Sequence, residues 1–137
     1  MDPRRWTPWT MLVPSRYVDR QRDWSDFDFE RWAEESYDWV SDPWNGYLDF
    51  ARRPGETIAG ERGDCEDFAL VAASWAIATG RNGVGLAFCW EVPYPWPRHV
   101  IAYDEEFVYS SGDVERTSVS EWVEESKYAF ALRRRVR

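Results

Sequence analysis

The segment Gly63-Asp64-Cys65-Glu66-Asp67 contains the residue of this chain that is best suited to covalent chemistry. A cysteine reacts as its thiolate, and nearby negative charge opposes the formation of that thiolate. The three acids beside Cys65 therefore raise a question that the rest of the sequence has to answer. Either Cys65 is a poor nucleophile or a buried structural residue, or the acids have another task.

A helix that begins at Cys65 gives the acids such a task. Residues 68–78 are apolar almost all round, which is typical of a helix buried in the middle of a domain. With Asp64 as the N-cap, we predict this helix from about Cys65 to Thr79, where Gly80 ends it. Unpaired N–H groups and the positive end of the helix dipole stabilise acids at this position, and they also favour a thiolate.

The only histidine of the chain, His99, is the candidate partner for this thiol. A Cys–His pair activates the sulfur, and a third group orients the imidazole. His99 opens the strand-like segment "HVIAY", and Asp113 follows on what we expect to be a neighbouring antiparallel strand. Cys65, His99 and Asp113 therefore form a candidate catalytic triad.

Each of these residues also has a simpler interpretation. A lone cysteine at a helix start is commonly a small packing residue, and a lone histidine on a strand is commonly hydrogen-bonded or exposed. Asp113 follows a glycine and is typical of a turn, and Cys89 lies in mid-strand, where we interpret it as a core residue. Cys65, Cys89 and His99 together resemble a zinc ligand set, although their spacing matches no familiar zinc pattern.

The pattern along the chain predicts an α+β fold, with helices first and mostly antiparallel strands after them. Residues 1–25 are rich in Pro, Trp and Arg, so we expect an extended N-terminal arm in which the Trp rings act as anchors. A single domain over residues 26–137 follows. The expected elements are a helix over 25–40, strands over 84–92, 98–104, 106–113 and 128–136, and a short helix over 118–126 with a Ser118–Glu121 capping box.

The composition fits a compact globular protein. The chain has 137 residues, is 44% hydrophobic and contains ten Trp, which is enough for one domain with one core. Its 25 acids against 17 bases give a net charge of −8, so a nucleic acid backbone is an unfavourable partner. We expect no membrane span, because no run of about 18 apolar residues occurs.

The composition also bears on compartment and habitat. The N-terminus has no continuous apolar segment, so we expect no signal peptide, a cytoplasmic location and free thiols at Cys65 and Cys89. All of the 17 basic residues except Lys127 are arginine. An acidic surface with almost no lysine is typical of a protein from a high-salt habitat, although a high-GC coding sequence favours arginine in the same way.

The segment "GDCEDFAL", a following strand, "HVIAY" and an aspartate on the next strand resemble the transglutaminase-like cysteine protease superfamily, and most of all its bacterial proteinases. The similarity extends over residues 44–115. It implies a papain-like or transglutaminase-like core in which a buried central helix carrying Cys65 packs on an antiparallel sheet. It also implies that Cys65 is the nucleophile, His99 the general base and acid, and Asp113 the orienting group in acyl transfer at a peptide amide.

The resemblance further implies a calcium ion as an accessory ligand, since the acyl transfer itself requires no cofactor. In some members of the family the acids beside the cysteine bind calcium, and Asp64 and Glu66 occupy the matching positions. Carboxylate oxygens suit Ca²⁺, and a bound divalent cation would reverse the local charge that the thiol experiences.

Single residues supply the other parts of the predicted site. The backbone N–H of Cys65 is a candidate oxyanion donor, together with an upstream group such as Trp44 or Asn45. Trp96, in "PYPWP" three residues before His99, is expected to line the substrate groove.

The chain also departs from the family pattern. Gly112 stands directly before the aspartate, where the family often has a strand residue, so Asp104 is the alternative orienting group to Asp113. Related enzymes that cleave adhesins are exported and longer, whereas this chain is compact and shows no export signal.

Two functional hypotheses follow. The first is a Cys-His-Asp peptidase or acyltransferase that acts on a protein or peptide, with hydrolysis favoured over cross-linking. The second is a non-catalytic structural or assembly protein that keeps the fold and associates through the N-terminal arm, for instance a component of a virus particle. A metal-binding module is a third alternative.

Overall fold

The computed structural model describes residues 7–39 and 53–136 as a sequence of short helices followed by a sheet. The first half contains α1 (Thr7–Leu12), η2 (Pro14–Arg16), α2 (Phe29–Arg31), η3 (Trp32–Ser36), β1 (Asp38–Trp39), α3 (Pro54–Gly60), β2 (Arg62–Gly63) and α4 (Cys65–Ala78). The second half contains β3 (Gly85–Trp90), β4 (His99–Tyr103), β5 (Val108–Ser110), β6 (Asp113–Glu115), α5 (Val119–Glu124) and β7 (Phe130–Arg135). The predicted α+β class is confirmed.

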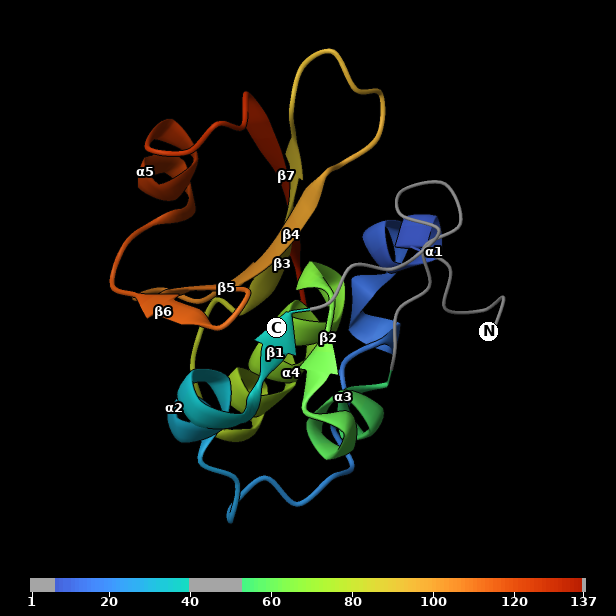
Figure 1. Cartoon of the computed structure of the whole chain (residues 1–137), viewed down its shortest axis with the longest axis vertical. Coiled ribbons are helices and arrows are strands. Elements are labelled where there is room, and N and C mark those ends of the chain that lie inside the picture. The colour runs from blue at the N-terminus through green and yellow to red at the C-terminus, as the bar shows by residue number, and fades with distance from the viewer. Residues whose placement is uncertain (1–6, 40–52, 137) are drawn as a thin grey trace.

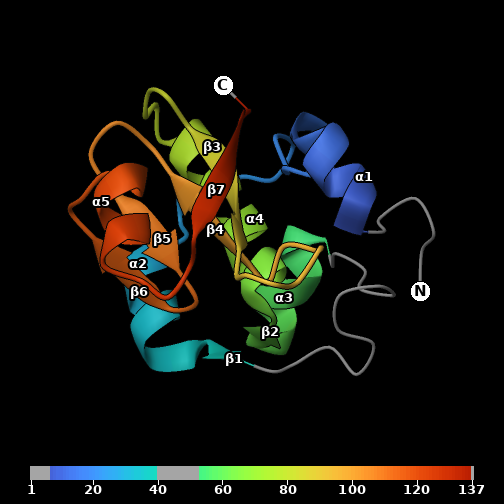
Figure 2. The same cartoon turned by 90° about the horizontal axis from the view of Figure 1, so that it is seen from above.

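The sheet has the strand order β6-β5-β4-β3-β7, and all of its neighbouring strands are antiparallel. Helix α4 lies against one face of this sheet and α5 against the other (Figures 1 and 2). A separate parallel pair joins β1 to β2, the strand that leads directly into α4. The sheet thus separates two environments, one around α4 and one around α5.

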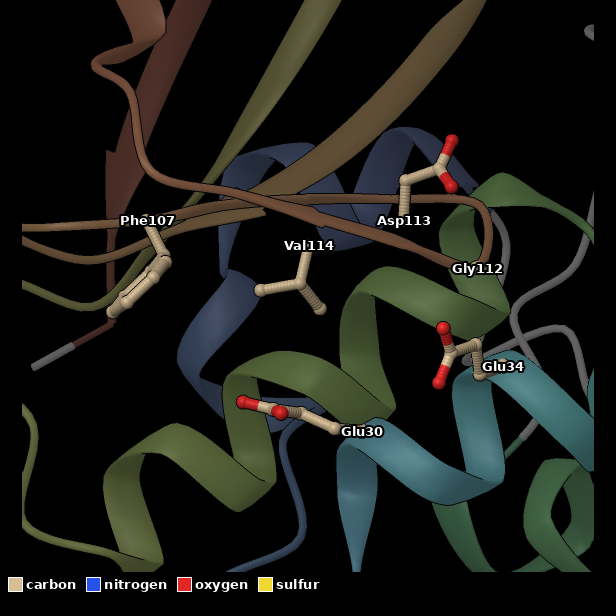
Figure 3. Close-up of a pocket in the computed structure, with 6 residues that line it drawn as sticks. All are labelled: Glu30, Glu34, Phe107, Gly112, Asp113 and Val114. Atoms are coloured by element: carbon tan, nitrogen blue, oxygen red, sulfur yellow. The ribbon is translucent and has the colours of Figure 1, made fainter.

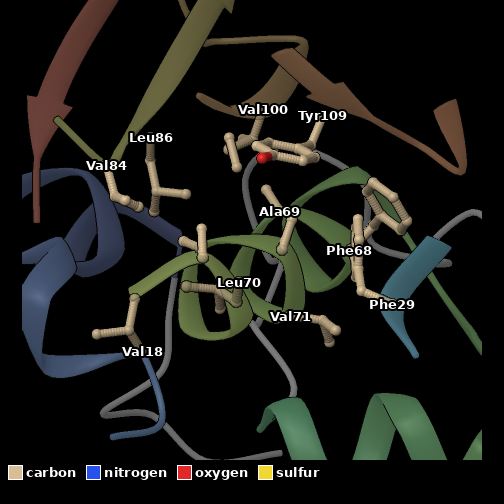
Figure 4. Close-up of a cluster of buried hydrophobic side chains, with 14 of the residues drawn as sticks. Val18, Phe29, Phe68, Ala69, Leu70, Val71, Val84, Leu86, Val100 and Tyr109 are labelled. Atoms are coloured by element: carbon tan, nitrogen blue, oxygen red, sulfur yellow. The ribbon is translucent and has the colours of Figure 1, made fainter. Parts of the chain in front are cut away.

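Helix α4 is the centre of the core, as its all-round apolar sequence predicts. It runs from Cys65 to Ala78 with Asp64 as its N-cap, in agreement with the predicted boundaries. Phe68, Ala69 and Leu70 are fully buried, and Figure 4 shows them between the sheet and the N-terminal segments. A helix that is apolar all round needs neighbours on all sides, and here the sheet and the helices of the first half supply them.

The strands divide their side chains between the two faces by simple alternation. Leu86 and Phe88 of β3 and Val100 and Ala102 of β4 pack toward α4, and Trp90 contacts the same cluster. The intervening residues form a second cluster under α5, made of Ala87, Cys89, Ile101, Val108 and Val119. Leu86, Phe88 and Trp90 therefore share one face of β3.

The first predicted helix is shorter than expected. Its N-cap is Asp28, whose carboxylate accepts a hydrogen bond from the backbone N–H of Arg31. The helix passes into a π-helical turn and ends at Ser36. Residues 38 and 39 then become a strand, since they pair with Arg62 and Gly63.

The N-terminal segment is not the extended arm that we predicted. Residues 7–12 form α1, and Tyr17, Val18 and Trp24 belong to the same buried cluster as α4. The anchoring role predicted for Trp rings holds for Trp24, which is 4% exposed. The apolar spacing of this segment is too irregular to reveal a helix, which is why composition alone suggested an extended path.

The C-terminal elements agree closely with the sequence. The hairpin around residues 104–106 joins β4 to β5, and the N-cap of α5 is Ser118, whose hydroxyl accepts from the Glu121 N–H at 3.2 Å. The Glu121 carboxylate accepts from the Thr117 hydroxyl at 3.4 Å, so only one half of the predicted capping box is seen. No helix within the described residues is long and apolar enough to cross a membrane.

Candidate active site

Cys65 occupies the first position of α4, directly after a reciprocal capping box. The Asp67 N–H donates to the Asp64 carboxylate at 3.0 Å, and the Asp64 N–H donates to the Asp67 carboxylate at 3.1 Å. Both acids are buried, and each accepts a hydrogen bond from a backbone N–H group at the positive end of the helix. The acids beside Cys65 therefore have the capping task that the sequence predicted.

Gly63 is required by the same arrangement. A Cβ atom at this position would lie only 2.6 Å from the Cβ atom of Asp67, so no larger residue fits while the capping box is closed. The Gly63 carbonyl also accepts a hydrogen bond of 2.8 Å from the Tyr37 hydroxyl. The backbone directly before Cys65 is thus fixed by its packing against Asp67 and by the hydrogen bond from Tyr37.

The predicted calcium ligands are both buried at the start of α4. The Asp64 carboxylate caps the helix, and Glu66 is fully buried. The described residues contain no group of three or more His, Cys, Asp or Glu side chains placed to hold a metal ion. That holds for the alternative zinc set of Cys65, Cys89 and His99 as well. Calcium binding therefore stays a prediction that rests on the resemblance.

His99 opens β4 and points to the α5 face of the sheet. Its ring lies nearly parallel to the rings of Trp122 and Tyr128, with centroid distances of 5.7 and 5.6 Å. Trp122 lies in α5 and Tyr128 in the segment before β7, and the centroids of these two rings are 5.9 Å apart. Two flat rings thus flank the half-buried imidazole.

The hydrogen-bond partner of His99 is Ser110, not an acid. The His99 Nε2 atom lies 2.8 Å from the Ser110 Oγ atom, which leaves Nδ1 as the ring nitrogen that can serve a thiol. Asp113 pairs directly with Ser110 across the β5–β6 hairpin, so the two side chains share the face that carries His99. Asp113 itself is exposed. In this arrangement Ser110 stands between the imidazole and the predicted orienting acid.

The environment keeps the His99 imidazole neutral. Burial, with a smaller contribution from the positive charge of Lys127, lowers the pKa of His99 to about 4. A neutral imidazole at neutral pH is the form that can accept a proton from a thiol. Cys89, the register partner of His99 on β3, is fully buried, and that burial raises the pKa of its thiol to about 12. Cys89 is therefore a core residue, as predicted.

Tyr128 stacks on His99 and also responds to the charge of Cys65. Burial raises the pKa of the Tyr128 hydroxyl to about 12, and the charge that Cys65 would carry as a thiolate is the second cause of that rise. Such an effect requires that the thiol and the phenol lie within electrostatic range of each other. Cys65, which is half-buried, packs against the cluster around α4, whereas the His99 ring lies on the α5 face of the sheet.

The packing of the β5–β6 hairpin tip shows at which end of the molecule Cys65 and His99 lie. A Cβ atom at Gly112 would lie 3.5 Å from the Tyr37 ring, and the hydroxyl of the same tyrosine holds Gly63. At the opposite end of the molecule, the Glu105 N–H donates to the Asn82 carbonyl at 3.2 Å, which joins the turn after β4 to the turn after α4. The N-terminal ends of α4 and β4 therefore lie at the same end of the helix–sheet unit.

Asp104, the alternative orienting group, lies at the wrong end of β4. A strand rises about 3.3 Å per residue, so Asp104 is on the order of 15 Å from His99 along the chain. Its carboxylate accepts from the Tyr109 hydroxyl at 2.5 Å and from the Glu106 and Phe107 N–H groups at 2.7 and 2.8 Å. Asp104 therefore fastens the β4–β5 turn, and the proposal that it orients His99 is wrong.

The predicted groove residues have different outcomes. Trp96 is half-buried in the loop between β3 and β4, directly before β4 begins. Trp44 and Asn45 lie outside the described residues. A surface hollow of about 400 Å³ lies under the β5–β6 hairpin and is lined by Glu30, Glu34, Phe107, Gly112, Asp113 and Val114. Figure 3 shows Val114 pointing toward α2 and Asp113 pointing to the other side of the hairpin, so this hollow is on the α4 face and away from His99.

Comparison of the chain with protein family models, with curated proteins and with solved structures gave no match. The residues of the site are therefore the basis for assigning a function.

The sequence interpretation missed Ser110, Trp122 and Tyr128. Ser110 is detectable in principle, because the turn "YSSGD" places Ser110 opposite Asp113 once the hairpin register is known. Trp122 and Tyr128 carry no local signal for a site, since only the folding of α5 over the sheet brings them to His99. From the sequence alone, Trp122 and Tyr128 are typical of core residues, because they are aromatic.

Proposed function

We propose that this protein is a transglutaminase-like cysteine peptidase that cleaves peptide amides through a thioester on Cys65. The observation that carries the proposal is Tyr128, whose ring stacks on His99 and whose raised pKa has the charge of a Cys65 thiolate as its second cause. The position of Cys65 at the start of a buried helix adds a positive dipole end that favours the thiolate.

In the proposed reaction, the neutral His99 imidazole accepts the proton of the Cys65 thiol while the sulfur attacks the amide carbonyl. The tetrahedral intermediate collapses when the imidazolium returns that proton to the departing amine, which leaves an acyl thioester. Water then attacks the thioester with His99 again as the base. The carboxylic acid product is released, and the Cys65 thiol is regenerated. An amine in place of water would give cross-linking, but no acceptor is needed for hydrolysis.

The low pKa of His99 bears on how the thiol is activated. A histidine with a pKa of about 4 is neutral at pH 7, so it acts as a general base during the attack and does not hold a preformed imidazolium beside a thiolate. Ser110 fits this form of the site, because a neutral hydroxyl orients the ring without stabilising its charged state.

Alkylation of the full chain with iodoacetamide, followed by mass spectrometry, tests the proposal. We expect Cys65 to be modified faster than free glutathione at pH 7, and the rate to fall about tenfold or more in His99→Ala. Cys89→Ser is the matched control, since the buried Cys89 thiol should contribute no fast labelling. A Cys65 that labels no faster than glutathione, with no response to His99→Ala, contradicts the proposal.

A second candidate function, a non-catalytic assembly protein, is favoured by one observation. Trp9, Leu12 and Val13, at and just after α1, are 46%, 55% and 37% exposed. Such an apolar group on the outside of a protein is typical of a contact with another protein. Because Tyr17 and Trp24 are core residues, deletion of residues 1–25 would unfold the protein. Leu12→Ser with Val13→Ser is therefore the appropriate test, and an assembly protein should lose association in this variant but keep it in Cys65→Ala.

A further inference from the structure

The outer edge of β7 is an open sheet edge with an unusual charge. Within the described residues, β7 is the last strand of the sheet and pairs only with β3 (Figures 1 and 2). All residues of β7 except Ala131 are exposed. An open edge presents unpaired N–H and C=O groups that can bind a further strand.

The backbone geometry identifies which groups point outward. The Val136 N–H donates to the Val84 carbonyl at 2.9 Å, so Val84 and Val136 form a hydrogen-bonded pair at the end of the β3–β7 ladder. Hydrogen-bonded and non-hydrogen-bonded pairs alternate along an antiparallel ladder. The N–H and C=O groups of Ala131, Arg133 and Arg135 therefore face away from β3 and toward the open edge.

The two faces of β7 differ in character. Phe130 and Leu132, 52% and 43% exposed, lie on the α4 side, where the Phe130 ring is nearly parallel to the Trp90 ring at 5.2 Å. Arg133 and Arg135 lie on the α5 side, where both positive charges act on the hydroxyl of Tyr103. A strand added at this edge would thus meet Phe130, Leu132 and Arg134 on one face and Arg133 and Arg135 on the other.

Several arginines gather at this edge of the sheet. Arg133 donates to the Ser120 hydroxyl, and Arg134 donates to the Leu12 carbonyl at 2.8 Å. Arg20 donates to the Val136 carbonyl at 2.6 Å, which brings a further guanidinium to the end of β7. In a chain of net charge −8, Arg20, Arg133, Arg134 and Arg135 thus gather at one edge of the sheet, and such a basic cluster favours a negatively charged ligand.

We propose that the outer edge of β7 binds an extended acidic segment of another protein as an additional strand of the sheet. The segment that fits alternates apolar residues, which meet Phe130 and Leu132, with Asp or Glu, which meet Arg133 and Arg135. A second copy of β7 does not fit, because pairing of two such strands would bring arginines together. Charged residues also protect sheet edges from aggregation, but that role predicts no acidic ligand.

Binding of a synthetic peptide tests this inference on the full chain. The probe is a short, blocked peptide of alternating Val and Glu with a fluorescent label, and the control peptide carries Lys in place of Glu. We expect the acidic peptide to bind in low salt, to bind more weakly as salt is added, and to lose about tenfold in affinity for Arg133→Glu with Arg135→Glu. Arg116→Glu, at the opposite edge of the sheet, is the matched control and should leave the affinity unchanged within about twofold.

Hydrogen exchange gives a second, independent measurement. On binding of the acidic peptide, the amides of Ala131, Arg133 and Arg135 should exchange more slowly, whereas those of Phe130 and Leu132 should change little. The inference is overturned if the acidic peptide does not bind, if the Lys peptide binds equally well, or if the charge reversal leaves binding unaltered. Self-association of the protein that the charge reversal abolishes would identify a second copy as the occupant and would also overturn it. None of these outcomes depends on Cys65, so the inference stands or falls separately from the peptidase.

Discussion

The Nε2 atom of His99 lies 2.8 Å from the Oγ atom of Ser110, so a neutral hydroxyl occupies the position next to the imidazole that an acid was predicted to fill. A carboxylate in that position would stabilise the imidazolium and raise the pKa of the histidine. The serine leaves burial as the dominant influence, and the pKa of His99 stays near 4. The imidazole is therefore uncharged at pH 7.

Ser110→Ala tests whether this hydrogen bond positions the ring. Loss of one hydrogen bond of this kind corresponds to about 1 kcal/mol, so we expect the alkylation rate of Cys65 to fall by about tenfold or less, while Ser110→Thr keeps most of it. The tautomer of His99, read from ¹⁵N chemical shifts of the ring, should shift in Ser110→Ala alone.

Asp113→Asn is the matched control for that experiment. Asp113 is exposed and pairs with Ser110, so its charge should affect the Cys65 alkylation rate by no more than about twofold. A larger loss in Asp113→Asn than in Ser110→Ala would return the orienting role to the aspartate.

The depressed pKa of His99 predicts a dependence of stability on pH. In the unfolded chain the imidazole has its ordinary pKa of 6.5, whereas in the folded protein it is about 4. Between these values the unfolded state binds more protons, so stability is fully present above pH 6.5 and is lost as the pH falls toward 4. The His99 contribution is at most about 3 kcal/mol.

Urea unfolding of the wild type and of His99→Gln between pH 4 and 7 measures this contribution. The wild type should lose stability relative to His99→Gln as the pH falls, because the variant has no imidazole to titrate. Parallel curves for the two proteins would mean that His99 is more hydrated than the ring stack of Trp122 and Tyr128 indicates.

The start of α4 was predictable because several local signals agree there. Asp64 is a good N-cap, Asp67 completes a capping box, and the apolar run that follows has the length of a helix. The strands were equally clear, since Leu86 and Phe88 alternate with residues of the other face. Where propensity, capping and periodicity point to one answer, the sequence is sufficient.

The composition of the site was much less predictable than its scaffold. The pairing of His99 with Ser110 depends on the register between β4 and β5, which no short motif encodes. The enclosure of His99 by Trp122 and Tyr128 depends on α5 folding back over the sheet. Long-range packing decides such contacts. The position of Asp113 in the sequence is therefore weak evidence that it orients His99.

Asp104→Asn distinguishes a structural acid from a catalytic one. The Asp104 carboxylate binds the Tyr109 hydroxyl at 2.5 Å and forms an ion pair with Arg81 at 3.5 Å while almost fully buried. We expect this variant to lose about 2–3 kcal/mol of unfolding free energy, measured by urea, because a buried network loses its charge.

The same variant should alkylate Cys65 at the wild-type rate under conditions where it stays folded. Tyr109→Phe is the milder companion, with an expected loss of about 1 kcal/mol. A marked loss of Cys65 reactivity in folded Asp104→Asn would show that the β4–β5 turn influences the site from its distant end.

Gly63→Ala tests whether the motif around Cys65 is held together by close packing. The added Cβ atom would lie 2.6 Å from the Cβ atom of Asp67, which real structures do not tolerate, so the capping box has to open. We expect a loss of about 2 kcal/mol or more, since the cap and the packing are both damaged. The Cys65 alkylation rate should fall as well, because the start of α4 positions the thiol.

Gly60→Ala is the control for this experiment, because its added Cβ atom would have only the Arg62 side chain nearby, at 4.0 Å. That substitution lies at the end of α3 and should leave stability and Cys65 reactivity nearly unchanged. If Gly63→Ala behaves like Gly60→Ala in both measurements, the backbone before Cys65 has room to relax. In that case the conformation of the segment, and with it the aim of the thiol, is set by Tyr37 and not by the capping box.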